Sequence, residues 1–508
     1  MSGPGPVYLD YAATTPVDPR VAACMAECLC ADSVFGNPAS THSFGRAARA
    51  RVEAARAQVA ALIGARPPDV IFSSGATEAD NLAILGSARG ARSARAAPVA
   101  HVITARTEHK AVLDPCRQLE REGFAVSYLT PADGGRITPE QLRAALRPET
   151  VLVSLMHANN ETGAVQDVAA FGAICRAHGA ALHVDAAQSA GKLPIDVVAM
   201  GIDLLSLTAH KLYGPKGIGA LYVQGSRRVG LQPLMFGGGH ERGLRSGTLP
   251  VHQIVGFGKA CELAAAAMVA ESARQAQLRE RLWAGIGTLP GVLLNSPPAY
   301  CLPGILNVSF TGIEGESLLF GLAELAVATG SACNSDSDEP SYVLRALGRD
   351  RETAQSSLRF SLGRNTDAAD IDRAVTAVRR EVLRLQAAAS AQATAAGAAA
   401  GAAVSGEAGM REQGTWVRLM LNTSGTLIER AEHQAYGCPH TMAACDWLVA
   451  RLKGRPWSDP GVGGPEDWAR ELGIPLDRLT RLLVVEDALR AALAAAQRAA
   501  PGGRTGVQ

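Results

Sequence analysis

Two stretches decide the fold, ALHVDAAQ at residues 181–188 and LLSLTAHKLYGPKG at residues 204–217. Each opens with a short apolar run that is typical of a buried strand and continues into a polar turn. Further runs of this kind, at 99–104 and 150–156, alternate with Ala/Leu/Arg-rich stretches of helical period. This alternation over residues 1–385 predicts an α/β fold with a mostly parallel sheet, whose strand ends carry the ligand-binding loops.

Two of these strand ends carry a lysine and a carboxylate. Lys211 follows the run 204–208, and Asp185 follows the run 181–184. A lysine at a strand end can enter a pocket, lose basicity by desolvation and form a Schiff base with an aldehyde cofactor. Pyridoxal phosphate also needs an anion against its ring nitrogen, and Asp185 is the candidate. An isolated lysine would more often be a solvated surface residue.

A third segment suits a phosphate group. Residues 73–81, SSGATEADN, form a small-residue turn that leads into a helix-like stretch, where backbone N–H groups can bind an anion. Alone, such a turn often only caps a helix. It has neither the GxxxxGK[ST] nor the GxGxxG spacing, so ATP and dinucleotides are poorer candidates. Together with Lys211 and Asp185, the segment favours pyridoxal phosphate.

Composition and charge narrow the class of protein. The chain has 508 residues with 49 Lys+Arg and 48 Asp+Glu, so no nucleic-acid footprint is expected. Ten cysteines without a CxxC pair or zinc-ligand spacing make neither a disulfide framework nor an obvious metal site. The N-terminus has no secretory pattern and no long apolar run predicts a membrane span, so we expect a cytoplasmic protein without membrane association.

Longer motifs carry a resemblance to a known family. The chain contains YLDYAATTPVDPRV (8–21), FGNPAS (35–40), SSGATEADNLAI (73–84), TEHKAVLD (107–114), HANNETG (157–163), HVDAAQSAGKLPID (183–196), AHKLYGPKGIGALYV (209–223), GGGHERGLRSGTLPVHQIVG (237–256), GSAC (330–333) and EPSYVLRALG (339–348). These segments resemble the group I cysteine desulfurases of the NifS/IscS kind. The resemblance implies a homodimeric fold-type I pyridoxal phosphate transferase, which removes sulfur from L-cysteine and leaves L-alanine and an enzyme persulfide. Its large domain would span about 16–260, and its small domain the N-terminal segment plus about 261–385.

The same match implies a set of site residues. Lys211 would bind the cofactor covalently and move the Cα proton, Asp185 would pair with the ring nitrogen, and His109 would lie over the ring face and help to move protons. Arg359, in SLRFSLGR, would clamp the substrate carboxylate together with Asn160, because a planar guanidinium suits a carboxylate. Asn160 and Gln188 would touch the ring hydroxyl region, and Ala76, Thr77, Thr208 and His210 would hold the phosphate, with Thr248 supplied by the partner subunit. Outside these motifs, such residues are more often core histidines and surface arginines.

The predicted nucleophile is Cys333, in GSACNSDSDEP at residues 330–340. Its polar, small-residue surroundings predict a mobile surface loop. Such a loop would let the thiolate attack the substrate sulfur and then present the persulfide to an acceptor. The family loop is nearer to SACTSASLEPS, so Asn334, Asp336 and Asp338 are departures. The two added carboxylates disfavour the thiolate and change the fit to an acceptor.

The composition changes after residue 385. Residues 386–410 are rich in Ala, Gly, Ser and Gln and predict a linker, helical where Ala dominates. Periodicity returns from Trp416, with two strand-like runs and then helices, so we expect a small α+β domain over 411–495 and a tail over 496–508.

The C-terminal domain resembles the iron–sulfur scaffold family of the IscU/NifU N-terminal kind, over about 416–492. Such a scaffold holds a cluster with three cysteines and an acidic residue, but here only Cys438, in YGCPHT, matches, and Arg481 takes the place of the last cysteine. Cys445 lies two helical turns beyond Cys438. One or two thiolates are too few for a cluster, even with Cys333 considered as a contact. A docking or persulfide-relay module is the favoured interpretation, with an inert Cys438 as the alternative.

Several functions stay open at this point. A selenocysteine lyase or a transaminase on the same fold would differ by its product, and a transaminase needs no thiol at Cys333. A purely scaffolding protein needs none of Lys211, Asp185, His109 and Cys333. The expected partners are L-cysteine and a sulfur acceptor or scaffold protein, in cis or in trans, which includes a protein of tRNA thiolation.

Overall fold

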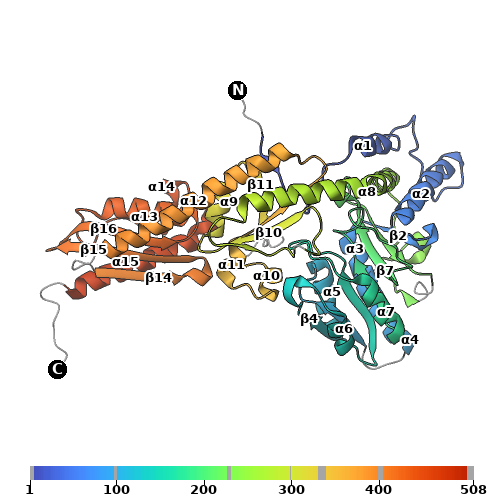
Figure 1. Cartoon of the computed structure of the whole chain (residues 1–508), viewed down its shortest axis with the longest axis horizontal. Coiled ribbons are helices and arrows are strands. Elements are labelled where there is room, and N and C mark those ends of the chain that lie inside the picture. The colour runs from blue at the N-terminus through green and yellow to red at the C-terminus, as the bar shows by residue number, and fades with distance from the viewer. Residues whose placement is uncertain are drawn as a thin grey trace.

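The computed structural model describes residues 5–95, 100–225, 230–297, 299–329, 339–398 and 404–499. Figure 1 shows three units in a row: a large α/β unit, a smaller unit beside it, and a C-terminal unit at the far end. The large unit has the mostly parallel α/β architecture predicted for residues 1–385, so that prediction is confirmed, whereas the four-stranded sheet of the small unit is antiparallel.

The large unit is built on a seven-stranded sheet of order β2-β8-β7-β6-β5-β3-β4. Strand β8 runs antiparallel to both neighbours, and the other pairs are parallel. The runs predicted at 150–156 and 204–208 are strands with those bounds. The strands are β2 (Val70–Ser73), β3 (His101–Ala105), β4 (Ala125–Leu129), β5 (Thr150–Met156), β6 (Ala181–Asp185), β7 (Leu204–Thr208) and β8 (Gly219–Val223).

Helices cover both faces of this sheet. Val70 and Phe72 of β2 join a core with α2, α7 and α8, whereas Ile71, between them, joins a second core with α3 to α5. Helices α3 and α4 are joined by the π-helical turn Leu82–Gly86 and so continue one another. The helices are α1 (Pro19–Ala26), α2 (Ser43–Leu62), α3 (Ala76–Asn81), α4 (Ser87–Arg95), α5 (Lys110–Arg121), α6 (Pro139–Ala145), α7 (Val168–His178) and α8 (Val251–Ile286).

The small unit has an antiparallel sheet of order β12-β13-β10-β9 and a parallel pair, β1 with β11. The pairing of β1 with β11 brings the N-terminal segment into this unit. The elements are β1 (Val7–Tyr8), β9 (Val292–Leu294), β10 (Ile305–Phe310), β11 (Leu325–Ala326), β12 (Ala328–Thr329), β13 (Ser357–Ser361), α9 (Gly315–Gly321), α10 (Tyr342–Ala346), α11 (Arg351–Gln355) and α12 (Ala368–Ala398).

Helix α8 belongs to both units. Its first half, with Ile254 and Phe257, lies in the core of the large unit, and Leu278 and Leu282 lie in the core of the small unit. Among the described residues it is the one helix long and apolar enough to cross a membrane. Because its apolar side chains pack into these two cores, we interpret it as a core helix.

The C-terminal unit begins earlier than predicted. Helix α12 continues through Ala398, and 404–410, expected to be linker, forms strand β14. The glycine-rich composition of this strand, which predicted a linker, reflects close packing. A Cβ on Gly406 would lie 2.0 Å from the backbone nitrogen of Ala492. Glycine lets α15 pack closely on β14. The elements are β14 (Val404–Met410), β15 (Thr415–Ser424), β16 (Leu427–Tyr436), α13 (Pro439–Leu452), α14 (Pro465–Leu472) and α15 (Leu479–Ala499), with sheet order β14-β15-β16.

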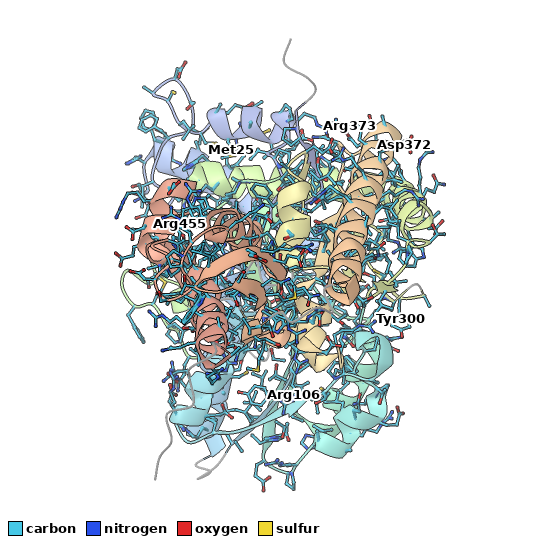
Figure 2. The ribbon with its side chains drawn as sticks, turned by 90° about the vertical axis from the view of Figure 1, so that its left-hand side faces the viewer. Met25, Arg106, Tyr300, Asp372, Arg373 and Arg455 are labelled. Atoms are coloured by element: carbon cyan, nitrogen blue, oxygen red, sulfur yellow. The ribbon has the colours of Figure 1, made fainter. Side chains whose placement is uncertain are left out.

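The C-terminal unit packs against the small unit and has its own core. Figure 2 looks onto this unit, which carries Arg455. The Ser317 hydroxyl of α9 donates to the Gly437 carbonyl over 3.3 Å, and Arg478 pairs with Glu316 over 2.8 Å. Both contacts fall on α9, so this helix is part of the docking surface of the C-terminal unit.

Candidate active site

A cavity of about 650 Å³ opens at the carboxyl ends of β5, β6 and β7, where open α/β sheets bind ligands. It brings together ten of the residues predicted from sequence. They are Ala76, Thr77, His109, Asn160, Asp185, Gln188, Thr208, His210, Lys211 and Arg359. Residues from positions 76 to 359 therefore converge on one site, while their individual roles stay predictions.

One end of the cavity is suited to a phosphate. The turn Ser74–Gly75 leads into α3, whose first N–H groups belong to Ala76 and Thr77 and have no intrahelical acceptor. Thr208 faces this turn, because a Cβ on Gly75 would lie 4.0 Å from Thr208 Oγ1. Free N–H groups at a helix start attract an anion.

Lys211 is presented by a tight turn after β7, the 3₁₀ helix Ala209–Lys211. The N-terminal segment holds this turn, since Thr15 donates from both its backbone nitrogen and its hydroxyl to the His210 carbonyl, each over 2.9 Å. Burial and then the charge of Lys211 lower the pKa of His210 to about 4. His210 is therefore neutral at pH 7, and its Nδ1 lies 3.2 Å from Thr14 Oγ1.

Asp185 ends β6 as a buried carboxylate. Its Oδ1 accepts the N–H of Ala187 over 2.8 Å. Behind it, His183 lies between Ser154 and Ser206, with 2.8 and 2.9 Å contacts to their hydroxyls, and burial lowers its pKa to about 3. His183 is therefore neutral at pH 7 and adds no positive charge at this strand end.

His109 stands at the start of α5. Its Nδ1 accepts the N–H of Ala111 over 3.1 Å, which leaves Nε2 to carry the ring proton. Burial lowers the pKa of His109, and the positive charge of Lys211 acts in the same direction against that of Asp185. A neutral imidazole is therefore available in the cavity at pH 7.

Arg359 extends from β13 of the small unit into the cavity. Its Nη1 donates to the Asn160 carbonyl over 2.8 Å and its Nη2 to Asp10 Oδ1 over 2.7 Å. The Asn160 side-chain oxygen and Arg359 Nε are buried without hydrogen-bond partners. Both groups are thus available to a bound molecule.

Two predicted residues that the structure describes, Thr248 and Cys438, do not line the cavity. Thr248 is exposed, three residues beyond Arg245, whose guanidinium pairs with Glu78 of α3 over 2.8 Å. Cys333, with Asn334, Asp336 and Asp338, lies outside the described residues. Cys438 lies in the C-terminal unit, buried just before α13, with Sγ 3.5 Å from Thr441 Oγ1.

Sequence reasoning missed three charged residues. Asp10 orients Arg359, and Lys192 donates to Gln188 Oε1 over 3.4 Å, with burial and then the charge of Lys211 lowering the pKa of Lys192 to about 7. Asp80 lines the cavity at 1% exposure, where burial and then Asp185 raise its pKa well above the usual value. Each lies inside a quoted motif, so a charged residue within an otherwise apolar or small-residue motif is the signal that could have found them.

The cavity fits pyridoxal phosphate. Gly75, Ala76 and Thr77 with Thr208 and His210 suit the phosphate, and the carboxylate of Asp185 suits a protonated ring nitrogen. Lys211 is placed to bind the aldehyde carbon, and the unpartnered Asn160 oxygen suits the ring hydroxyl. Gln188, expected beside that hydroxyl, donates its side-chain amide to the Ala12 carbonyl over 2.8 Å.

Comparisons with known proteins agree with this site. The family model described as aminotransferase class-V matches residues 7–374. The cysteine desulfurase IscS of Pectobacterium atrosepticum is 57% identical over 382 residues, which cover 75% of this chain and 94% of the relative. That of Escherichia coli O139:H28 is 56% identical over the same shares.

Solved structures give the same family. A structure titled "NIFS-LIKE PROTEIN" has a TM-score of 0.68 and 34% identity and covers 75% of this chain and 99% of its own. A structure titled "SspA in complex with cysteine" has a TM-score of 0.62 and 40% identity, over 70% and 98% of the two chains. Enzymes of this kind use pyridoxal phosphate, for which the cavity has the matching donor set. The chain therefore belongs to the class-V aminotransferase family and, within it, to the cysteine desulfurases of the IscS/NifS kind.

Proposed function

We propose that this cysteine desulfurase takes sulfur from L-cysteine as a persulfide on Cys333, releases L-alanine, and supplies sulfur to iron–sulfur cluster assembly or another sulfur acceptor. The observation that carries the proposal is that a buried arginine and a strand-end lysine line the same cavity. Arg359 is 6% exposed and lines the same cavity as Lys211. A guanidinium there suits the carboxylate of an amino acid, and the lysine suits its α-carbon chemistry.

Different residues of the chain carry out different steps of the reaction in this proposal. Bound pyridoxal phosphate supplies an electron sink for the bonds at Cα. Arg359 orients the substrate carboxylate, Lys211 takes the Cα proton and later returns a proton, and neutral His109 holds or moves a proton over the ring. The Cys333 thiolate attacks the substrate sulfur, so that an S–S bond forms as the C–S bond breaks. The products are alanine and the Cys333 persulfide, and no external oxidant or reductant is needed.

The enzyme acts as a homodimer in this proposal, with Thr248 completing the phosphate site of the partner. Support comes from the exposure of Thr248 and from Phe236, 83% exposed on the same loop. Exposed aromatic side chains are typical of interfaces. Light scattering is expected to give twice the chain mass of 52.7 kDa, and a monomer that still releases alanine would contradict this part.

The C-terminal unit serves as a scaffold-like docking or relay module. Its Cys438 follows Gly437, whose carbonyl accepts from Ser317 of α9, so the cysteine lies at the surface shared with the small unit. Arg481, where the scaffold resemblance would place a cysteine, binds Thr415 Oγ1 over 2.7 Å, and a cation there disfavours a cluster. Five residues separate Ala398 of α12 from Val404 of β14, a reach of at most about 23 Å. So short a tether keeps the module close to the enzyme.

Product analysis tests the proposal. The cofactor-loaded enzyme is given L-cysteine, alanine is quantified, and persulfide is located by mass spectrometry in the unmodified protein, Cys333→Ser and Cys438→Ser. Alanine with persulfide on Cys333 and then on Cys438 supports the desulfurase with an internal relay. Persulfide confined to Cys333 supports a docking module only. A keto acid, selenide release from selenocysteine alone, or no alanine at all would overturn the desulfurase.

A further inference from the structure

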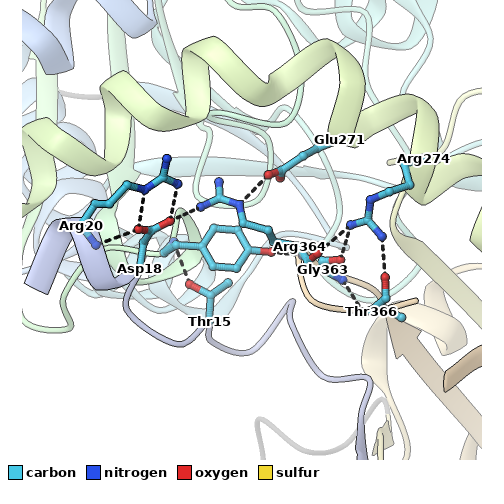
Figure 3. A network of polar contacts seen from close by, with 9 residues as sticks. Thr15, Asp18, Arg20, Glu271, Arg274, Gly363, Arg364 and Thr366 are labelled. Carbon is cyan, nitrogen blue, oxygen red and sulfur yellow. Dashed lines mark hydrogen bonds and ion pairs between the residues drawn. The ribbon is translucent and has the colours of Figure 1, made fainter. Parts of the chain in front are cut away.

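A network of charged side chains links the turn of Lys211 to the strand that carries Arg359. Figure 3 shows it, with Asp18 and Arg20 from the N-terminal segment, Glu271 and Arg274 from α8, and Gly363, Arg364 and Thr366 from the segment after β13. These elements come from three distant parts of the sequence, so the network is a tertiary feature.

The turn of Lys211 ends in a conformation that needs support. Tyr213, two residues after Lys211, has a φ of 63°, in the left-handed region that a tyrosine rarely adopts. Its N–H donates to Thr15 Oγ1 over 2.8 Å, and its carbonyl accepts the N–H of Asp18 over 2.9 Å. Such a conformation persists where its surroundings over-determine it.

Arg364 contributes the contacts that reach Tyr213 from the small unit. Its backbone N–H donates to the Tyr213 hydroxyl, and its guanidinium carbon lies 4.1 Å from the centre of the Tyr213 ring. The same guanidinium donates to Asp18 Oδ2 over 2.7 Å and to Glu271 Oε1 over 2.5 Å. It is therefore fixed on two sides by carboxylates while it covers the ring.

The segment that carries Arg364 is itself fastened to α8. Arg274 donates to the carbonyls of Gly363 over 2.8 Å, Arg364 over 3.0 Å, and Thr366. Arg364 follows Arg359 by five residues and lies three residues beyond the end of β13 at Ser361. A displacement of Arg364 is thus passed on to the strand that presents Arg359.

We propose that Arg364 is a positioning residue, which keeps Lys211 and the substrate-binding Arg359 in register by clamping Tyr213 between the two units. We call this contact of Arg364 with Tyr213 the clamp. The proposal rests on the proposed desulfurase function only in taking Arg359 to bind the substrate carboxylate. The effect of Arg364 on Lys211 is measured on the bound cofactor and does not depend on the substrate. Arg364 acts by positioning Tyr213, since Arg364 does not line the cavity.

The test compares Arg364 with Arg20, because both arginines bind the carboxylate of Asp18. Arg20 also binds Asp18, over 2.9 and 2.7 Å, but is 61% exposed and lacks the contact with Tyr213. In Arg364→Gln we expect the KM for cysteine to rise about tenfold with a smaller change in kcat, because misplaced groups lose effective concentration. We also expect the pH midpoint of the bound-cofactor absorbance to move by about half a pH unit, because the surroundings of Lys211 change. In Arg20→Gln both quantities should stay near the values of the unmodified enzyme.

Three results decide the outcome. Equal KM and equal absorbance midpoints in Arg364→Gln and Arg20→Gln, with alanine still formed, overturn the clamp. A loss of melting temperature alone, without either shift, shows an ordinary structural role and also overturns it. If Arg364→Gln does not fold, Tyr213→Phe decides: it removes only the hydroxyl that accepts from Arg364, and a shift in the same direction supports the clamp whereas no shift overturns it. Absence of alanine from the unmodified enzyme would instead contradict the proposed function, while the absorbance midpoints still test the clamp.

Discussion

Asp10 and Arg359 form an ion pair of 2.7 Å at the wall of the cavity, although 349 residues separate them. Asp10 follows β1, and Arg359 lies on β13 of the same unit. The pair uses one edge of the guanidinium and leaves Nε without a protein partner. Asp10 therefore sets the direction in which Arg359 meets a carboxylate.

Removal of the Asp10 charge should weaken substrate binding. In Asp10→Asn we expect the KM for cysteine to rise about tenfold, since a hydrogen bond to a charged group contributes about 1.5–3 kcal/mol. Steady-state kinetics measures this rise. Asp372→Asn, which removes the partner of Arg281 in an exposed pair of the same length, is the control. An unchanged KM in Asp10→Asn would show that Arg359 keeps its direction without Asp10.

A second ion pair should stabilise the large unit. Arg56 and Glu241 are 3% and 8% exposed, and Nη1 and Nη2 of Arg56 each donate to the Glu241 carboxylate over 2.8 Å. Glu241 also accepts the N–H of Phe72 on β2, which leads to the phosphate turn. Loss of one partner of a buried pair costs about 3–5 kcal/mol. We expect Glu241→Gln to lower the free energy of unfolding by that amount and to weaken cofactor binding.

Denaturant titration and cofactor titration check this expectation for Glu241→Gln. The matched control is Glu262→Gln, because Glu262 pairs with Lys259 but half of its side chain is exposed. An exposed pair contributes at most about 1 kcal/mol. Equal destabilisation by the two variants would contradict a special role of the buried pair.

The strands of the large sheet could be predicted because they are buried on both faces. Runs such as 150–156 and 204–208 are apolar or β-branched except for one serine each, Ser154 and Ser206, and they became β5 and β7 with the predicted bounds. Strand β14 could not be predicted, because its Gly406 and Gly409 serve close packing against α15 and the next strand rather than an apolar face. Its composition resembles a linker for that reason.

The residues of the site likewise fall into those that the sequence predicts and those that only the structure shows. Ala76, Thr77, Asp185 and Lys211 lie at the ends of strands or the start of a helix, so their convergence follows from the topology of a parallel sheet. The pairing of Asp10 with Arg359 depends on β1 joining the small unit, and no local pattern reports that contact. Tertiary partners of this kind need the structure.

Acid should destabilise the protein through His157. Burial lowers the pKa of His157 to about 4, below the value near 6.5 of an unfolded histidine. Between these two values the unfolded chain binds a proton that the folded protein excludes, so stability falls as the pH falls. From pH 6.5 to pH 4.5 the loss from this group is about 2 kcal/mol. We expect that His157→Gln loses about that much less stability than the unmodified protein over the same interval.

Denaturant titrations at both pH values measure the difference for His157→Gln. His178→Gln, at an exposed histidine of α7, is the control and should follow the unmodified protein. All other titrating groups are shared by the three proteins, so they cancel in the comparison. Parallel pH dependence in all three would show that His157 takes up a proton in the folded state.

Arg478 should control access to Cys438. Arg478 pairs with Glu316 of α9, both about one-third exposed, and Cys438 is 1% exposed beside this surface. In Arg478→Glu two carboxylates face each other, and the reversal of a surface pair costs about 1 kcal/mol, or about fivefold in the population of the undocked unit. We expect iodoacetamide to label Cys438 about fivefold faster in this variant, followed by mass spectrometry. Arg470→Glu, which changes a pair within α14, should leave the rate unchanged. Equal labelling rates in the two variants would show that contacts other than Arg478–Glu316 hold the C-terminal unit on α9, because Cys438 would then stay covered after the charge reversal.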